Sequence, residues 1–482
     1  MAVSKVWRFA ILVLSIVVLQ GCATNPVTGA RTFAMGEDWE IQTGRANHPK
    51  ILQEYSVYED PELQAYVNEI GQKLAAKSHR ANLDFTFTLL DSPQVNAFAL
   101  PGGFIYITRG IMAYMTKEAH LAGVIGHEIG HVTAAHGAQR AAQAQIGGIA
   151  TAAVAIATGS QELAQASQML GGALISGYGR KQELESDRLG AEYIAQNNYS
   201  PDDMVGVIGI LKDQELFAAE KARREGRQVQ GYHSLFSTHP KNDQRLQEVI
   251  SAADRLRDTT KPTPDDGRFL RLTDGMAYGE SEKQGITRGN KFYHKSLDLF
   301  IEFPEGWRIQ NGQSVLAAIA PSGDKLIQLR MDSVAPPVDG VRYLGTKFPQ
   351  FRDAQRVPTN EDQAVSGVAT ISDQNTGQQQ NLRVAMINRG NQAFLLSGVG
   401  KTAMPTQEVL DVAKSVRRLK SNERKLAEGR TIKLVRVKAG DTIASLARAS
   451  NLDDYAEAQL RLINDLYPSD EPKVGQLIKV IK

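Results

Sequence analysis

The chain has 482 residues, 42% hydrophobic and 22% charged, with a formal net charge of +2. A chain of this length is too long for one ordinary core, so we expect about two to four domains. The nearly balanced charge excludes the basic surface of a nucleic-acid-binding protein, and no nucleic-acid partner is expected.

The N-terminus has the pattern of a secretory signal over 1–21, with basic residues ahead of an apolar run, 9–19, that is short for a membrane-spanning helix. The run ends in LQGC, which resembles the lipobox of bacterial lipoproteins, with Cys22 as the lipid-bearing residue. Because Ala23 follows, the resemblance implies a periplasmic protein anchored to the outer membrane. The alternative is an incidental cysteine after an ordinary signal peptide. A lipidated Cys22 leaves no thiol for disulfides, nucleophilic catalysis or metal binding.

The pattern along the chain predicts an α+β multidomain protein. Residues 22–48 are expected to be a tether, and 49–255 a mainly helical domain, because apolar residues recur there at helical spacing. A stretch rich in Pro, Asp and Thr predicts a linker over 256–289. Residues 290–420 combine short β-type runs with turn signals and predict a small α/β domain without concentrated chemistry. A compact unit, 431–482, ends the chain.

The stretch GVIGHEIGHVTAAH carries the strongest chemical signal. On a helix His127 and His131 lie one turn apart on one face, where both imidazoles can reach the same ion. Glu128 is near enough to bind a water held by that ion. Two imidazoles, a third protein ligand and an open position suit Zn²⁺; a chance motif on a solvated helix is the alternative. His136 lies about 140° around a straight helix from His131, so we expect it to support a ligand histidine or the structure instead of binding metal.

A carboxylate from another helix must complete the site, and Glu162 and Glu183 are the downstream candidates. Glu183 and Asp187 share one helix face, so the first can bind metal while the second accepts the Nδ1 proton of a ligand histidine. Glu162 has no such companion, and Glu185 points away from the shared face. We therefore predict Glu183 as the third ligand.

With YEDPELQAYVNEIGQKLA, VNAFALPGGFIYITRGIM, ELESDRLGAEYI and STHPKNDQRL, these motifs resemble the CaaX prenyl endopeptidase-like family of zinc metallopeptidases over about 55–250. The resemblance implies a mainly helical zincin-like domain with a small edge-strand sheet and one Zn²⁺ per chain. It implies the same three metal ligands, Glu128 as general base, and Asp187 beside a ligand histidine. It also makes His239 and Arg245 candidate catalytic residues that steady the oxyanion. A neutral His239 could instead occupy the fourth position of zinc at rest.

The same resemblance gives a role to NAFALPGGFIYITRG, 96–110, as the edge strand beside the zinc. An extended substrate can add there as a further strand, over Asn96, Ala97, Phe98 and Ala99. The twelve-residue apolar run 146–157 is too short to span a bilayer. We expect small-residue helices over 139–178, packed above the site.

The stretches VKAGDTIASLARASNL and LRLINDLYPSDEPKVGQLIKVI resemble the lysin motif (LysM), a βααβ module that binds glycans such as peptidoglycan. The matching positions are 440–442, Asn464 and 475–476. The stretch NLDDYAEAQ departs from the commonest pattern, so a structural module that binds no glycan is the alternative.

Three functions are compatible with these features. The first is an outer-membrane-anchored, periplasmic zinc endopeptidase that cleaves misfolded or misassembled envelope proteins. The second is a chaperone-like assembly factor, and the third a peptidoglycan-binding lipoprotein with secondary proteolysis. The complete set of ligands and base favours the first.

Overall fold

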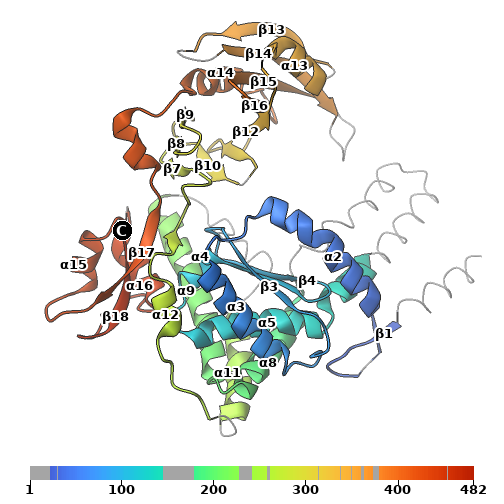
Figure 1. Cartoon of the computed structure of the whole chain (residues 1–482), viewed down its shortest axis with the longest axis vertical. Coiled ribbons are helices and arrows are strands. Elements are labelled where there is room, and N and C mark those ends of the chain that lie inside the picture. The colour runs from blue at the N-terminus through green and yellow to red at the C-terminus, as the bar shows by residue number, and fades with distance from the viewer. Residues whose placement is uncertain are drawn as a thin grey trace, which may run out of the picture. The chain divides into compact units, whose positions relative to one another are not determined.

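The computed structural model describes residues 22–482, except 30, 145–177, 227–241, 258–260, 313, 337, 349, 360–362, 373–378 and 453. Two compact units divide the chain. The first contains the residues up to Tyr278 together with Thr431–Lys482, and the second is Gly279–Arg430 (Figure 1). The mixture of helices and sheets agrees with the predicted α+β multidomain class.

A three-stranded sheet lies at the centre of the first unit. It is built from β3 (Thr86–Leu90), β4 (Ala97–Leu100) and β5 (Phe104–Thr108), in the order β3-β5-β4. β5 is parallel to β3 and antiparallel to β4. Since β4 pairs with β5 alone among the described residues, it forms an edge of the sheet in this part of the chain. The expectation of one edge strand over 96–110 therefore needs correction, because its second half is the central strand.

Helices cover both faces of this sheet (Figure 1). Side chains of α2 (Glu37–Glu54) and the aromatic rings Phe98, Phe104 and Tyr106 form a small core on one face. On the other face, α3 (Pro61–Ala75) and α5 (Glu118–Thr133) belong to the main core of the unit. A single turn, α4 (Arg109–Met112), connects the end of β5 toward α5.

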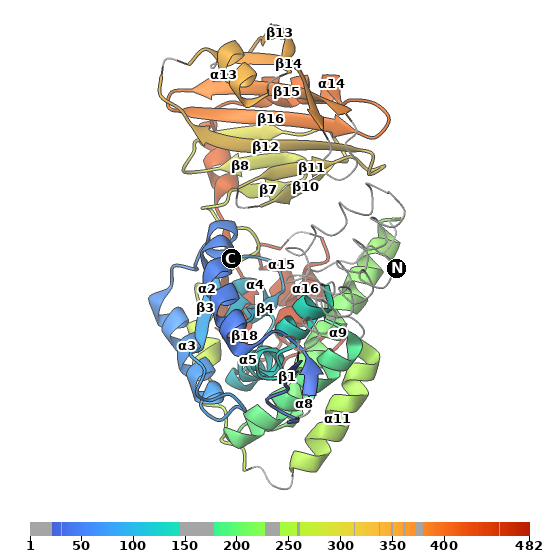
Figure 2. The ribbon, with the colours of Figure 1, turned by 90° about the vertical axis from the view of Figure 1, so that its right-hand side faces the viewer.

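Two further helices pack on α5, which is buried along almost its whole length, and a third helix packs on those two. They are α8 (Arg180–Gln196), α9 (Asp202–Arg224) and α11 (Asn242–Arg257). Figure 2 shows them on the side of α5 that is remote from α3. The metal-binding motif therefore lies on a core helix that other elements hold on all sides.

The N-terminal stretch is folded where we expected a tether over 22–48. β1 (Cys22–Thr24) and β2 (Arg31–Phe33) form a hairpin, and α2 follows directly. Arg80 is buried and lies 2.7 Å from Glu37 and 3.2 Å from Glu40, both on α2. The turn residues near Pro26 suggested a linker, but a long-range ion pair that the local sequence does not reveal holds this stretch in place.

The predicted linker over 256–289 is also partly folded. α12 (Arg268–Leu272) buries Phe269 completely in the main core of the first unit. β6 (Ala277–Tyr278) then joins the C-terminal sheet in the order β18-β17-β6. Phe269, which follows the Pro-rich part, therefore anchors the chain in this stretch.

The second unit is built on antiparallel sheet, with its own buried cores. One sheet has three strands, β7 (Ile286–Arg288), β8 (Lys291–His294) and β9 (Leu299–Glu302). The other has the order β10-β11-β12-β16-β15-β14-β13: Arg308–Asn311, Leu316–Ile319, Lys325–Ser333, Gln392–Gly400, Gln379–Arg389, Gln363–Ser372 and Arg352–Val357. Helices α13 (Gly340–Lys347) and α14 (Thr406–Ser415) and a 3-10 turn, η2 (Ser421–Ala427), complete the unit.

The C-terminal module follows the order strand, helix, helix, strand. Its elements are β17 (Arg430–Arg436), α15 (Ile443–Arg448), α16 (Ala456–Ile463) and β18 (Leu477–Ile481). β17 pairs antiparallel with β18. None of the helices in the described part of the chain has the length and apolar content that crossing a bilayer requires.

Candidate metal centre

The two histidines of the motif meet on one face of α5. His127 and His131 are buried, and their Nε2 atoms lie 3.0 Å apart. The helical spacing that the sequence predicts is therefore the spacing in the structure. Two Nε2 atoms aimed at one point can bind one cation between them.

Small residues let α8 approach this face closely. A Cβ atom added to Gly130 would lie 3.0 Å from the Cα and carbonyl oxygen of Ser186. A Cβ atom added to Gly190 would lie 3.0 Å from the backbone nitrogen of His127. Contacts this short leave no room for a side chain, so the glycines allow the two backbones to touch. This approach brings the first turn of α8 to the histidines.

Glu183 in that first turn supplies the third ligand atom. Its Oε2 lies 3.7 Å from Nε2 of His127, and its Oε1 lies 3.5 Å from Nε2 of His131. The ligand atoms of a tetrahedral zinc ion are about 3.3 Å apart, given bond lengths of about 2.0 to 2.1 Å. The three residues form the one group of potential metal ligands found among the described residues, with ligand atoms within 4.8 Å of one another. Their chemistry and spacing thus fit a zinc ion.

Groups behind the histidines orient the rings. Asp187 Oδ1 lies 2.8 Å from Nδ1 of His127. Nδ1 of His131 lies 2.9 Å from Nδ1 of His136, whose Nε2 lies 3.2 Å from a carboxylate oxygen of Glu185. With each Nδ1 occupied, the Nε2 atoms face the metal position. The structure places His136 behind a ligand histidine, and it gives Glu185 a contact that the sequence did not suggest.

Arg245 holds the carboxylates of Glu183 and Asp187 on α8 in place. Its guanidinium donates to both carboxylate oxygens of Asp187 at 2.7 Å and lies 3.2 Å from Glu183. Burial by itself would raise the pKa of Asp187, but the charge and hydrogen bonds of Arg245 outweigh it and hold that pKa below its usual range. The predicted role of Arg245 in steadying the oxyanion stays a prediction, while these contacts show that its guanidinium holds both carboxylates. The geometry supports a positioning role.

Glu128 lies beside a small cavity next to the ligands. The cavity has a volume of about 20 Å³, room for about one water molecule. Glu128, His127 and Arg245 form its polar wall, Ala97 of β4 borders it, and the remaining wall is apolar: Ile111, Val124, Met204, Val207, Ile208 and Leu211. The edge strand and the predicted general base therefore border the same space.

The other predicted substrate-binding residues lie along the same edge. Asn96 immediately precedes β4, and its buried Oδ1 has no hydrogen-bond partner within the described part of the chain. Phe98 and Ala99 lie on β4, where Phe98 stacks on Tyr106 with ring centroids 4.8 Å apart. Along β4, Ala97 is the position that borders the cavity.

Two candidates lie outside the described residues. They are His239 and the alternative ligand Glu162, and most of the predicted helices over 139–178 lie there too. Tyr178 is described, and its ring stacks on His131 with centroids 3.7 Å apart. We did not predict this contact. No spacing in the sequence indicates it, because Tyr178 is far along the chain from His131.

A helix with paired histidines, an adjacent glutamate and a carboxylate from a second helix defines the class of zinc metallopeptidases. Comparison with family models narrows the class. Residues 61–253 match Peptidase family M48, and residues 435–480 match the LysM domain. Residues 61–253 are thus similar to the peptidases of family M48, residues 435–480 are similar to LysM domains, and both predicted resemblances are confirmed.

Individual relatives show similarity across the peptidase region. The Beta-barrel assembly-enhancing protease of Yersinia pestis is 27% identical over 259 residues, covering 52% of this chain and 49% of the relative. The protein of the same name from Escherichia coli is 27% identical over 237 residues, 47% of this chain and 46% of the relative. The Mitochondrial metalloendopeptidase OMA1 of Schizosaccharomyces pombe is 26% identical over 230 residues, 46% and 64% respectively. The chain spans about half the length of the first two.

Proposed function

We propose that this chain is a zinc-dependent endopeptidase that hydrolyses peptide bonds of unfolded or misassembled envelope proteins. The observation that carries the proposal is the cluster of His127, His131 and Glu183 beside Glu128 and the edge strand β4. The similarity to proteases named for β-barrel assembly supports a substrate among envelope proteins.

Glu128 is the residue that moves protons in this proposal. Zinc held by the three ligands supplies Lewis-acid activation of the attacking water and of the scissile carbonyl. Glu128 borders the cavity that has room for that water. Its carboxylate takes a proton from the attacking water and passes it to the leaving amine. The cleavage needs no covalent intermediate with the protein.

The edge strand positions the substrate. β4 has one paired neighbour within the described ranges, so its other edge offers backbone donors and acceptors to an extended peptide. Ala97 places this strand at the cavity beside Glu128. Pairing through the main chain depends little on side chains, which favours unfolded segments of many sequences.

The proposal includes a location at the outer membrane. The sequence around Cys22 supports a lipid anchor there, and the LysM domain supports contact with peptidoglycan. Both would hold the peptidase in the periplasm near newly assembled outer-membrane proteins. Replacement of Cys22 by serine should leave an unlipidated precursor, which palmitate labelling and membrane fractionation would detect; normal labelling of the variant would refute the anchor.

The proposed base is tested by replacing Glu128 with glutamine. The variant should keep a full equivalent of zinc and the same melting temperature, because no ligand is lost. Hydrolysis of casein should fall by at least about a hundredfold, the range for a general base. Glu192→Gln, a change of the same type on α8, is the matched control. Hydrolysis by Glu128→Gln at the wild-type rate would rule out this mechanism.

A chaperone-like assembly factor is the second candidate, supported by the open edge of β4. In that function clients bind the strand and proteolysis is secondary. The Glu128→Gln variant separates the two. If it restores envelope assembly in cells that lack the wild-type protein, binding is the main activity, whereas failure to restore assembly favours proteolysis.

A further inference from the structure

The LysM domain and the peptidase domain share one hydrophobic core. Ile432, Ile443, Leu460 and Ile481 of the module lie in the same buried cluster as side chains of α3, α5 and α9. β17 also pairs with β6, a strand that precedes the second unit in the sequence. A flexibly attached binding module would lack both features. The module is therefore built into the first compact unit.

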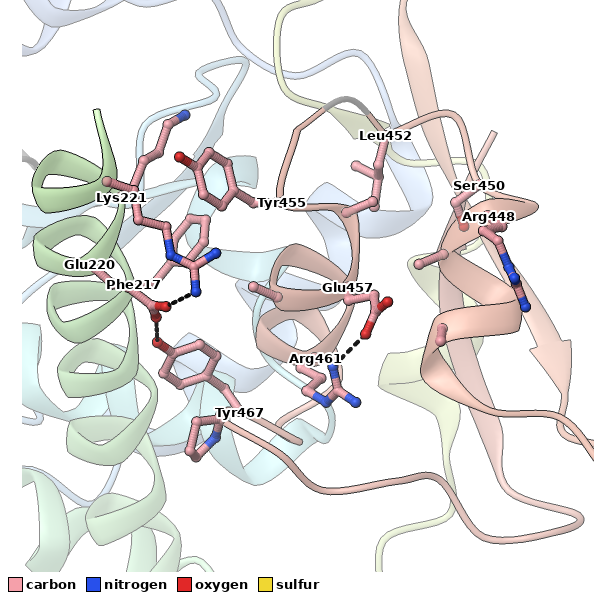
Figure 3. A pocket seen from close by; sticks show the side chains of 16 residues that line it. Phe217, Glu220, Lys221, Arg448, Ser450, Leu452, Tyr455, Glu457, Arg461 and Tyr467 are labelled. Atoms are coloured by element: carbon pink, nitrogen blue, oxygen red, sulfur yellow. Dashed lines mark hydrogen bonds and ion pairs between the residues drawn. The ribbon is translucent and has the colours of Figure 1, made fainter. Parts of the chain in front are cut away.

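Aromatic contacts fix the module on α9. Tyr467 donates a hydrogen bond to Glu220 at 3.0 Å, and the ring of Phe217 meets the rings of Tyr455 and Tyr467 edge-on (Figure 3). These contacts border an open cavity of about 690 Å³ between α9 and the two helices of the module. α9 also lines the cavity beside Glu128 through its first half. One helix thus touches both the module and the candidate active site.

The most unusual contact is made by Lys479 of β18. Its side chain is completely buried, and Nζ donates to the carbonyl oxygens of Ala113 at 2.6 Å and Met115 at 2.5 Å. Asn464 holds the backbone of Lys479 through two hydrogen bonds of 2.8 Å. The backbone of Lys479 is therefore held within the module, while its Nζ atom bonds to the peptidase domain.

Burying the amine of Lys479 costs free energy that an apolar side chain at the same position would not cost. Burial of an amine is unfavourable, and a methionine would fill similar space without that penalty. Burial lowers the pKa of Lys479 to about 7, while the Asp465 carboxylate acts in the opposite direction. A neutral amine keeps N–H donors, so the carbonyls retain a partner in either protonation state. The contact thus points to a role in fixing these two carbonyls.

The carbonyls of Ala113 and Met115 lie in the short connection between α4 and α5. Ala113 directly follows α4, and Met115 lies three residues before Glu118, where α5 begins. The next turns of α5 carry His127, Glu128 and His131. A shift at the start of a rigid helix moves all residues on it together. The lysine therefore acts on the segment that sets the position of the metal ligands.

We propose that Lys479 is a positioning residue of the metal centre, through which the LysM domain holds the start of α5 in place. The proposal rests on the proposed function, but it concerns metal binding and helix position, which can be measured without proteolysis. In this view the module is required for an ordered active site whether or not it binds glycan.

The test compares Lys479→Met with Lys479→Gln, which keeps N–H donors, in the full chain. Lys482→Met, which removes an exposed lysine of the same module, is the matched control. Lys479→Met should bind zinc about tenfold more weakly in competition with a chelator, in the lower range for loss of a supporting contact. Amide hydrogen exchange at residues 116–121 should speed up. The glutamine variant should recover part of both effects, and the control should change neither.

The kinetic result separates positioning from general stabilisation. For an unstructured peptide, kcat should fall while KM stays the same, since β4 does not contact the lysine. Unchanged zinc affinity and exchange in Lys479→Met, with only a lower melting temperature, would overturn the proposal. If Lys479→Met does not fold, Asn464→Ala, which releases the backbone of Lys479, decides: wild-type zinc affinity and wild-type exchange at 116–121 in that variant would also overturn it. If the variants lose zinc affinity but no variant or wild type cleaves peptides, the proposed function fails and the positioning role stands.

Discussion

At the scale of single residues, the metal centre depends on carboxylates that are costly to bury. Glu183 and Asp187 are almost fully enclosed, and each would be unstable as an isolated charge. Arg245 supplies the compensating positive charge to both. The histidines, carboxylates and arginine therefore form one network, in which removal of Arg245 leaves two buried carboxylates without their positive partner.

We predict that Asp187→Asn weakens zinc binding by about ten- to a hundredfold, the usual effect of losing a group that orients a ligand histidine. The amide is a poorer acceptor for the Nδ1 proton of His127 and no longer balances the charge of Arg245. Competition with a chelator measures the affinity. Glu192→Gln on the same helix is the control, and equal zinc affinity in both variants would contradict a role for Asp187.

At the scale of elements, the crossing of α5 and α8 brings the ligands together. The sequence predicts His127, His131 and Glu183 because their spacing along each helix is local information. It does not reveal the close approach of the helices, which depends on glycines whose neighbours lie far along the chain. The folding of α2 through Arg80 and the stacking of Tyr178 on His131 were missed for the same reason.

We predict that Gly190→Ala lowers zinc affinity more than stability. The new methyl group would lie 3.0 Å from the backbone nitrogen of His127, so α8 must move away and take Glu183 with it. Gly209→Ala is the control, since a Cβ atom there meets nothing within 4 Å. Zinc titration and thermal unfolding of the two variants check the prediction, and an unchanged zinc affinity in Gly190→Ala would show that the crossing tolerates a side chain.

At the scale of the whole molecule, the chain that leaves the peptidase domain at Tyr278 returns to it at Thr431. The sequence predicts the LysM resemblance, because its motif is local. The burial of this module against the peptidase core was not predicted, since Lys479 and Ala113 are separated by most of the chain. The same buried lysine makes the stability of this unit depend on pH.

We predict that stability toward urea rises between about pH 7 and pH 10 in the wild type, relative to Lys479→Met. The pKa of Lys479 is about 7 in the folded state, below its ordinary value of 10.5. In this range the unfolded chain binds the proton more strongly, so raising the pH favours folding. Lys117, His120 and Asp465 are the nearby titratable groups, and both proteins retain them. Equal slopes of stability against pH in the two proteins would contradict the assignment.

The most direct test of the account measures zinc and proteolysis together in Glu183→Ala and in Glu192→Ala, which changes a glutamate of the same helix away from the metal ligands. The wild type and Glu192→Ala should each bind one equivalent of zinc and cleave casein. Both should lose activity with a chelator and regain it with zinc. Glu183→Ala should bind little zinc and cleave no casein. A full equivalent of zinc in Glu183→Ala, or proteolysis that survives the chelator, would contradict the central claim that these residues form a catalytic zinc site.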